Sequence, residues 1–145
     1  MKVAQPPKIE VRNQQRTIAL KTVELQKHAQ KAVAVCRRLF VKKRTELERL
    51  AEISILIVSD RRMAALHRKF MNLSGPTDVI TFQHGEIFIS AETALRNAQR
   101  FGNSLARELK LYIVHALLHL HGFDDRDVAR ARKMRRAEAK VLSSL

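Results

Sequence analysis

The feature that most constrains the fold is a long apolar segment that carries two histidines one helical turn apart. Its leucines and its valine fall around most of the circumference of a helix, which is typical of a helix at the centre of a domain: Leu105, Leu109, Val114, Leu117, Leu118 and Leu120. His115 and His119 are four residues apart, so both imidazoles project from one face. At this spacing two histidines can hold one metal ion.

The residues after this segment offer a third ligand. Gly122 can end the helix and turn the chain back. Asp124 and Asp125 follow, and the spacing alone does not choose between them. His121 is the weaker candidate, because in continuous helix it points about 200° away from His119. Three protein ligands with one open position are typical of a catalytic zinc site.

One residue excludes a familiar chemistry. Zinc peptidases of the His-Glu-x-x-His type place a general-base glutamate directly after the first histidine. Here that position is Ala116, so peptide hydrolysis by that mechanism is not expected.

The rest of the chain alternates between strand and helix patterns. Alternating or β-branched runs predict strands at residues 8–13, 53–58, 77–82 and 86–90, the last two as a hairpin. Helical periodicity predicts helices at about 22–41, 91–100, 104–121 and 127–142. A further helix is expected to begin at Ser59 or Asp60 and run through Phe70, with Gly75-Pro76 as its break. This order indicates one α+β (α/β-like) domain over residues 1–145, with a small mixed sheet and the metal site at the end of the long central helix.

The charge points to a polyanionic partner. Lys and Arg number 28 against 14 Asp and Glu, a net charge of +14, which favours nucleic acid. With six Phe, one Tyr and no Trp, phosphate contacts are expected rather than base stacking. The sequence shows neither an apolar leader nor a run of membrane-spanning length, so a cytoplasmic location is expected. Its single cysteine, Cys36, is expected to be a buried small hydrophobe.

Two separate motifs resemble one known family. Residues 115–125, His-Ala-Leu-Leu-His-Leu-His-Gly-Phe-Asp-Asp, resemble the His-Gly-x-Leu-His-Leu-x-Gly-Tyr-Asp-His signature of the YbeY-type rRNA-maturation endoribonucleases. Residues 76–82, Pro-Thr-Asp-Val-Ile-Thr-Phe, and 85–90, Gly-Glu-Ile-Phe-Ile-Ser, are similar to that family's Pro-Thr-Asp-Val-Leu-Ser-Phe and Gly-Asp-Ile-x-Ile-Ser blocks.

The resemblance implies a metal-dependent endoribonuclease that acts in 16S rRNA 3′-end maturation and ribosome quality control. It implies one Zn²⁺ per chain, held by His115, His119 and Asp125, with Asp125 standing where the third histidine of the family usually stands. The two histidines would act in catalysis through the bound ion and its water. The implied partners are ribosomal RNA and ribosomal particles, with a ribosomal protein or a GTPase as further candidates.

Two departures from the family pattern qualify this picture. An oxygen ligand replaces the third imidazole, so the site should accept Mn²⁺ or another divalent ion more readily. Phe70 is followed by Met71, where the family typically has an arginine suited to a phosphate contact. Arg68 or Lys69 nearby is expected to substitute for it, and basic faces that include Arg61, Arg62 and Lys69 are expected to hold the RNA backbone.

Two rival functions follow from the same residues. The first is a non-catalytic RNA- or ribosome-binding assembly factor with a structural metal, which Met71 favours. The second is a metallohydrolase of small substrates, which the net charge disfavours. A basic final helix, with Arg130, Arg132, Lys133, Arg135, Arg136 and Lys140, is expected to be mostly a solvated face that could also touch phosphates.

Overall fold

The computed structural model describes residues 5–145, which form four strands and six helices in one α+β domain. The expected domain bounds also include residues 1–4, which lie outside the described residues. In chain order the elements are β1 (Lys8–Asn13), α1 (Thr22–Leu39), α2 (Glu46–Arg49), β2 (Glu52–Val58), α3 (Asp60–Met71), β3 (Val79–Thr81), β4 (Glu86–Ser90), α4 (Ala91–Phe101), α5 (Leu105–Leu120) and α6 (Val128–Ser143).

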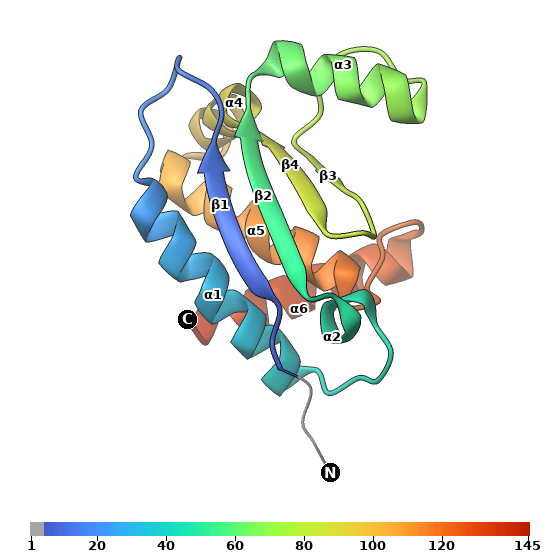
Figure 1. Ribbon diagram of the computed structural model, residues 1–145. Helices are drawn as coiled ribbons and strands as arrows, with labels where there is room; N and C mark the ends of the chain where they lie inside the picture. The colour runs from blue at the N-terminus through green and yellow to red at the C-terminus, as the bar shows by residue number, and fades with distance from the viewer. Residues whose placement is uncertain (1–4) are drawn as a thin grey trace.

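The sheet is small and mixed, as the sequence predicts. Its strand order is β1-β2-β4-β3. β1 and β4 both run parallel to β2, whereas β3 pairs antiparallel with β4 as the far arm of the expected hairpin. In Figure 1 the strands cross the front of the molecule, α5 passes behind them, and α3 lies above the end of β2.

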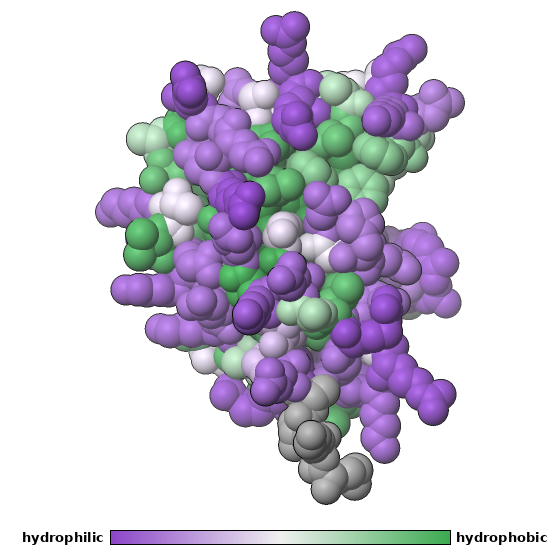
Figure 2. Space-filling model, in the orientation of Figure 1, coloured by the Kyte–Doolittle hydropathy of each residue, from purple (hydrophilic) through white to green (hydrophobic). Residues whose placement is uncertain are grey.

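The two faces of the sheet have different cores because successive side chains of a strand point to opposite faces. Ile53, Ile55 and Ile57 of β2 pack into the main core with α1, α5 and α6. Leu56 and Val58 of the same strand face the other way, toward a smaller cluster under α3. On that side hydrophobic residues gather around α3, while most of the remaining surface is hydrophilic (Figure 2).

α5 is the buried centre that its apolar pattern predicts. Nine of its 16 residues are buried, including Leu109, Ile113 and Leu117. Ser104 caps the first turn by accepting a hydrogen bond from the Arg107 backbone N–H. The helix packs against α1, α4 and α6, so its last two turns, which carry both site histidines, sit on a rigid support.

Several element bounds differ from those expected. α1 ends at Leu39, and a four-residue helix that the sequence reading missed, α2, follows it. α3 ends at Met71, before Gly75-Pro76, because Asn72 takes the left-handed conformation (φ 53°) that closes a helix. β3 is only Val79–Thr81, shorter than the expected 77–82. In residues 5–145, no helix is both long enough and apolar enough to cross a membrane.

Candidate metal centre

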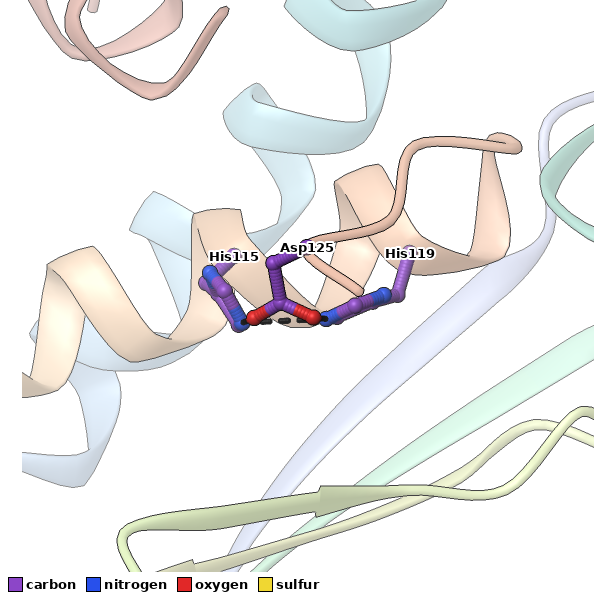
Figure 3. Close-up of side chains that lie close together, drawn as sticks. All are labelled: His115, His119 and Asp125. Atoms are coloured by element: carbon purple, nitrogen blue, oxygen red, sulfur yellow. Dashed lines mark hydrogen bonds and ion pairs between the residues drawn. The ribbon is translucent and has the colours of Figure 1, made fainter. Parts of the chain in front are cut away.

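The site lies where α5 ends and the chain turns back over it. His115 and His119 project from the same face of α5, and Asp125 reaches them from the loop between α5 and α6 (Figure 3). Gly122 makes this turn with a φ of 91°, which a residue with a side chain adopts only under strain. These three residues form the group that could hold a metal ion among residues 5–145.

The ligand atoms lie at separations that suit one ion. His115 Nε2 is 3.0 Å from His119 Nε2. The Asp125 carboxylate straddles the pair, with Oδ2 3.7 Å from His115 Nε2 and Oδ1 3.8 Å from His119 Nε2. Zn–N and Zn–O bonds of about 2.0–2.1 Å in tetrahedral geometry place ligand atoms about 3.3 Å apart. Two imidazoles and a carboxylate are also a ligand set that divalent ions accept, so the residues fit the expected metal.

A fourth side chain, Glu138, fixes the orientation of the first histidine. Its Oε1 accepts a hydrogen bond from Nδ1 of His115 at 2.6 Å, which leaves the Nε2 lone pair directed at the site. Burial is the largest single effect and lowers the pKa of His115, but the hydrogen bond and charge of Glu138 act together with the charges of Asp125 and Asp78, and the net result is a raised pKa.

Sequence reasoning missed Glu138, although a signal was present. It is the one acidic residue in the strongly basic α6, and it stands beside the buried Ala137 and four residues after the buried Met134. A carboxylate next to the packing side of an otherwise cationic helix needs a buried partner. His115 is that partner.

The second histidine stays uncharged more easily. Burial and the neighbouring His115 both lower the pKa of His119, and the charge of Asp125 with a backbone hydrogen bond at Phe123 only partly offsets them. A neutral imidazole is the form that binds a metal, so the environment of His119 favours the ligand state.

The three residues open onto a groove of about 720 Å³ between α5, its following loop and β3. Within residues 5–145, three carboxylates line it, those of Asp78, Asp124 and Asp125, against the single cation Arg126. Arg126 is itself engaged, with Nη2 3.1 Å from Oδ2 of Asp124. Met71, at the end of α3, lies in the groove wall, at the position where the family pattern has an arginine.

His121 turns away from the site even though the helix has ended. Its Nδ1 lies 2.8 Å from Thr45 Oγ1, and its Nε2 bonds the carbonyl oxygen of Phe40. This fully buried imidazole therefore ties the end of α5 to the segment between α1 and α2. The basic residues expected to contact RNA lie elsewhere: all four are exposed on α3, and none lines the groove (Arg61, Arg62, Arg68 and Lys69).

The fold and the site together define a small α+β protein with a groove able to hold one metal ion between a helix and a loop. Comparisons with known proteins agree with this class. The model of the family described as "Endoribonuclease YbeY" matches residues 10–145. The chain belongs to the endoribonuclease YbeY family.

Individual relatives support this assignment. An endoribonuclease YbeY of Anaeromyxobacter sp. is 37% identical over 134 residues, covering 83% of this chain and 70% of the relative. One from Heliobacterium modesticaldum is 35% identical over 112 residues, covering 63% and 68%. A solution structure from Thermotoga maritima has a TM-score of 0.61 and covers 94% of this chain and 90% of that one, at 22% identity, so it bears on the fold alone.

These findings confirm the family resemblance and the expected fold class. They also confirm the expected class of enzyme, because the family is one of endoribonucleases, hydrolases that cut RNA. The ligand assignment stays a prediction, supported by the geometry of the cluster.

Proposed function

We propose that this chain, as one domain over residues 1–145, is a metal-dependent endoribonuclease that hydrolyses phosphodiester bonds in ribosomal RNA, in 16S rRNA 3′-end maturation and ribosome quality control. The single observation that carries the proposal is the convergence of His115, His119 and Asp125 on one point of an open groove. The motifs shared with the endoribonuclease YbeY family support the RNA substrate.

The proposed cofactor is one Zn²⁺ per chain, with another divalent ion as a substitute because the carboxylate is a harder ligand than imidazole. A divalent ion in such a site supplies Lewis-acid polarisation of the phosphodiester and activation of water. The chain's own residues hold the geometry: Glu138 orients His115, α5 fixes both imidazoles, and Asp125 closes over them from the loop.

The proposed partners are ribosomal RNA and ribosomal particles, with a ribosomal protein or a GTPase as a further partner. This substrate would place the activity in the cytoplasm, where ribosomes are assembled. The sequence's net charge of +14 supports a polyanionic substrate.

The test is a cleavage assay on ribosomal RNA with the wild-type protein and His119→Ala, after elemental analysis of each. The wild type should carry about one metal ion per chain and cleave the RNA. His119→Ala should carry no metal, and its cleavage rate should be at least ~100-fold lower. RNA binding by folded His119→Ala should be largely intact. The matched control is His84→Ala, an exposed histidine outside the groove, which should keep both metal and activity.

One observation favours a second function. Met71 places a thioether in the groove wall where an arginine would meet a phosphate, which suits a non-catalytic RNA- or ribosome-binding assembly factor with a structural metal. Full metal loading without cleavage, even on intact ribosomal particles, would contradict the nuclease and support this alternative. Met71→Arg would then be the first variant to assay for restored cleavage.

A further inference from the structure

A second groove, of about 580 Å³, lies between the end of α1 and the middle of α6. In the part of the chain that the structure describes, four cations line it together with apolar side chains, and no carboxylate does. We call this set the basic groove and define it by Lys42, Lys133, Arg136 and Lys140.

The charges of the basic groove have no internal counterpart. Among residues 5–145, none of its four cations forms an ion pair with a carboxylate. The lysines lie over aromatic rings instead, with Lys42 Nζ 3.9 Å and Lys133 Nζ 6.0 Å from the centroid of Phe123. Burial and the charge of Lys133 lower the pKa of Lys42, so these cations repel one another in a partly enclosed space.

The aromatic residues of the groove are walls rather than stacking platforms. Phe40 and Phe123 meet edge to face with their centroids 5.0 Å apart. Phe123 is only 7% exposed, so its ring cannot receive a base. What the groove offers a ligand is therefore positive charge, not a surface for base stacking.

The metal groove has the opposite character. Its three carboxylates and its engaged arginine make it a poor place to hold several phosphates. A polyanion that reaches the metal groove needs cations close by, and the basic groove is next to it: Phe123 lines both. Lys42 also lies close to the loop of the metal site: its Nζ is 3.4 Å from the position that a Cβ would take at Gly122.

We propose that the basic groove binds backbone phosphates of the RNA strand whose scissile bond lies in the metal groove. The proposal rests on the proposed function for the identity of the polyanion. It differs from the RNA contacts expected on α3, because it assigns the binding to α6 and to the segment after α1.

The test compares two double variants of one helix with equal loss of charge. Lys133→Gln with Arg136→Gln removes two cations of the basic groove, and Arg132→Gln with Arg135→Gln removes two exposed cations of α6 outside it. Binding of a labelled single-stranded RNA with the sequence of the 3′ end of 16S rRNA is measured by fluorescence anisotropy across a salt series, with chelator present to prevent cleavage. Circular dichroism checks that both proteins are folded.

The groove variant should bind about tenfold more weakly, and its slope of log K against log salt should fall by about 1.4, or 0.7 for each lost contact to a single strand. The control should change by clearly less. Equal losses in both variants, or no loss in the groove variant, would overturn the proposal. The second arm is a calorimetric titration with inorganic phosphate. If phosphate binding depends on Lys133 and Arg136 but RNA affinity does not depend on them, the groove is a site for small anions and the proposal is overturned.

The failure of this inference is distinguishable from that of the proposed function. RNA binding is read in chelator, so it does not depend on cleavage. If the groove variant alone loses RNA binding and the wild type never cleaves RNA, the proposed RNA site in the basic groove stands and the nuclease is rejected. If the wild type cleaves RNA and the groove variant binds RNA as tightly as the wild type, the nuclease stands and the RNA site in the basic groove is rejected.

Discussion

Glu138 is the residue on which the alignment of the first histidine depends. Its carboxylate lies behind His115, 13% exposed, and accepts a hydrogen bond from Nδ1–H at 2.6 Å. A carboxylate in this position also makes an imidazole more basic and therefore a stronger ligand. Its effect on the site is thus exerted through His115, not by touching an ion.

We expect Glu138→Ala to weaken metal affinity by about 10- to 100-fold, because His115 would lose both its orientation and its negative partner. Competition with a chromophoric chelator measures this. Glu138→Gln is the matched control: it keeps a hydrogen-bond acceptor without the charge, and it should fall between wild type and alanine. Lower thermal stability with unchanged metal affinity would show that Glu138 only supports packing.

At this scale the sequence predicts part of the site. The i, i+4 spacing pairs His115 with His119, because helical geometry is local. The choice of Asp125 over Asp124 depends on how the chain turns after Gly122, which spacing does not determine. Glu138 comes from a separate helix, and its contact with His115 depends on how α5 packs against α6, which the sequence reading did not reach.

At the scale of elements, the turn after α5 decides whether the third ligand reaches the other two. The helix ends with backbone hydrogen bonds from His121 and Phe123 to Leu118, and Gly122 between them takes a positive φ. His121 anchors this end to Thr45 and Phe40. The loop therefore starts from a fixed point, and Asp125 follows three residues after the glycine.

We expect Gly122→Ala to lower the free energy of unfolding by about 1–2 kcal/mol, since a Cβ at positive φ is strained, and also to weaken metal binding by displacing Asp125. Gly102→Ala is the control: it has a φ of 69°, open space around its Cα, and a position at the end of α4, away from the site. Urea unfolding should show a similar loss for both variants, whereas a chelator titration should show weaker binding only for Gly122→Ala. Equal metal affinities would contradict this role of the turn.

The elements that sequence patterns predicted well are those with long periodicity or clear caps. α4 and α5 begin after the serines Ser90 and Ser104, and Gly102 closes α4 in the left-handed conformation. α2 was missed because one helical turn is too short for a periodic signal. β3 is shorter than its apolar run because only Val79–Thr81 pair with β4 as a ladder; Asp78 and Phe82 form single backbone hydrogen bonds to the two ends of β4.

At the scale of the whole molecule, charge is divided between two neighbouring grooves. The protein is strongly basic overall, yet carboxylates predominate in the groove that holds the metal-ligand cluster. The basic groove adjoins it across Phe123. Composition predicted the polyanionic partner, but it could not predict this separation, which arises when α6 packs beside the end of α1.

Because the ligand cluster forms only when α5 and the loop after it are folded, a bound ion should stabilise the entire fold. At a free Zn²⁺ concentration 100 times its dissociation constant, we expect a stabilisation of about 2.7 kcal/mol, which for a chain of this size is a rise in Tm of up to about 9 °C. Calorimetry with Zn²⁺ and then with EDTA measures the shift. In His119→Ala the shift should vanish, and an equal shift there would mean that the ion binds elsewhere.

The three ligands differ in how rigidly the fold holds them, and this difference affects how the ion is released. Two imidazoles are fixed on a helix that is buried along most of its length, while the third ligand is a carboxylate on a loop, with 48% of its side chain exposed. Rotation of that one side chain opens the cluster without unfolding α5. Loss of the ion should therefore not require α5 to unfold, and the fraction of loaded protein should follow the free ion pool of its surroundings instead of preserving the ion acquired at synthesis.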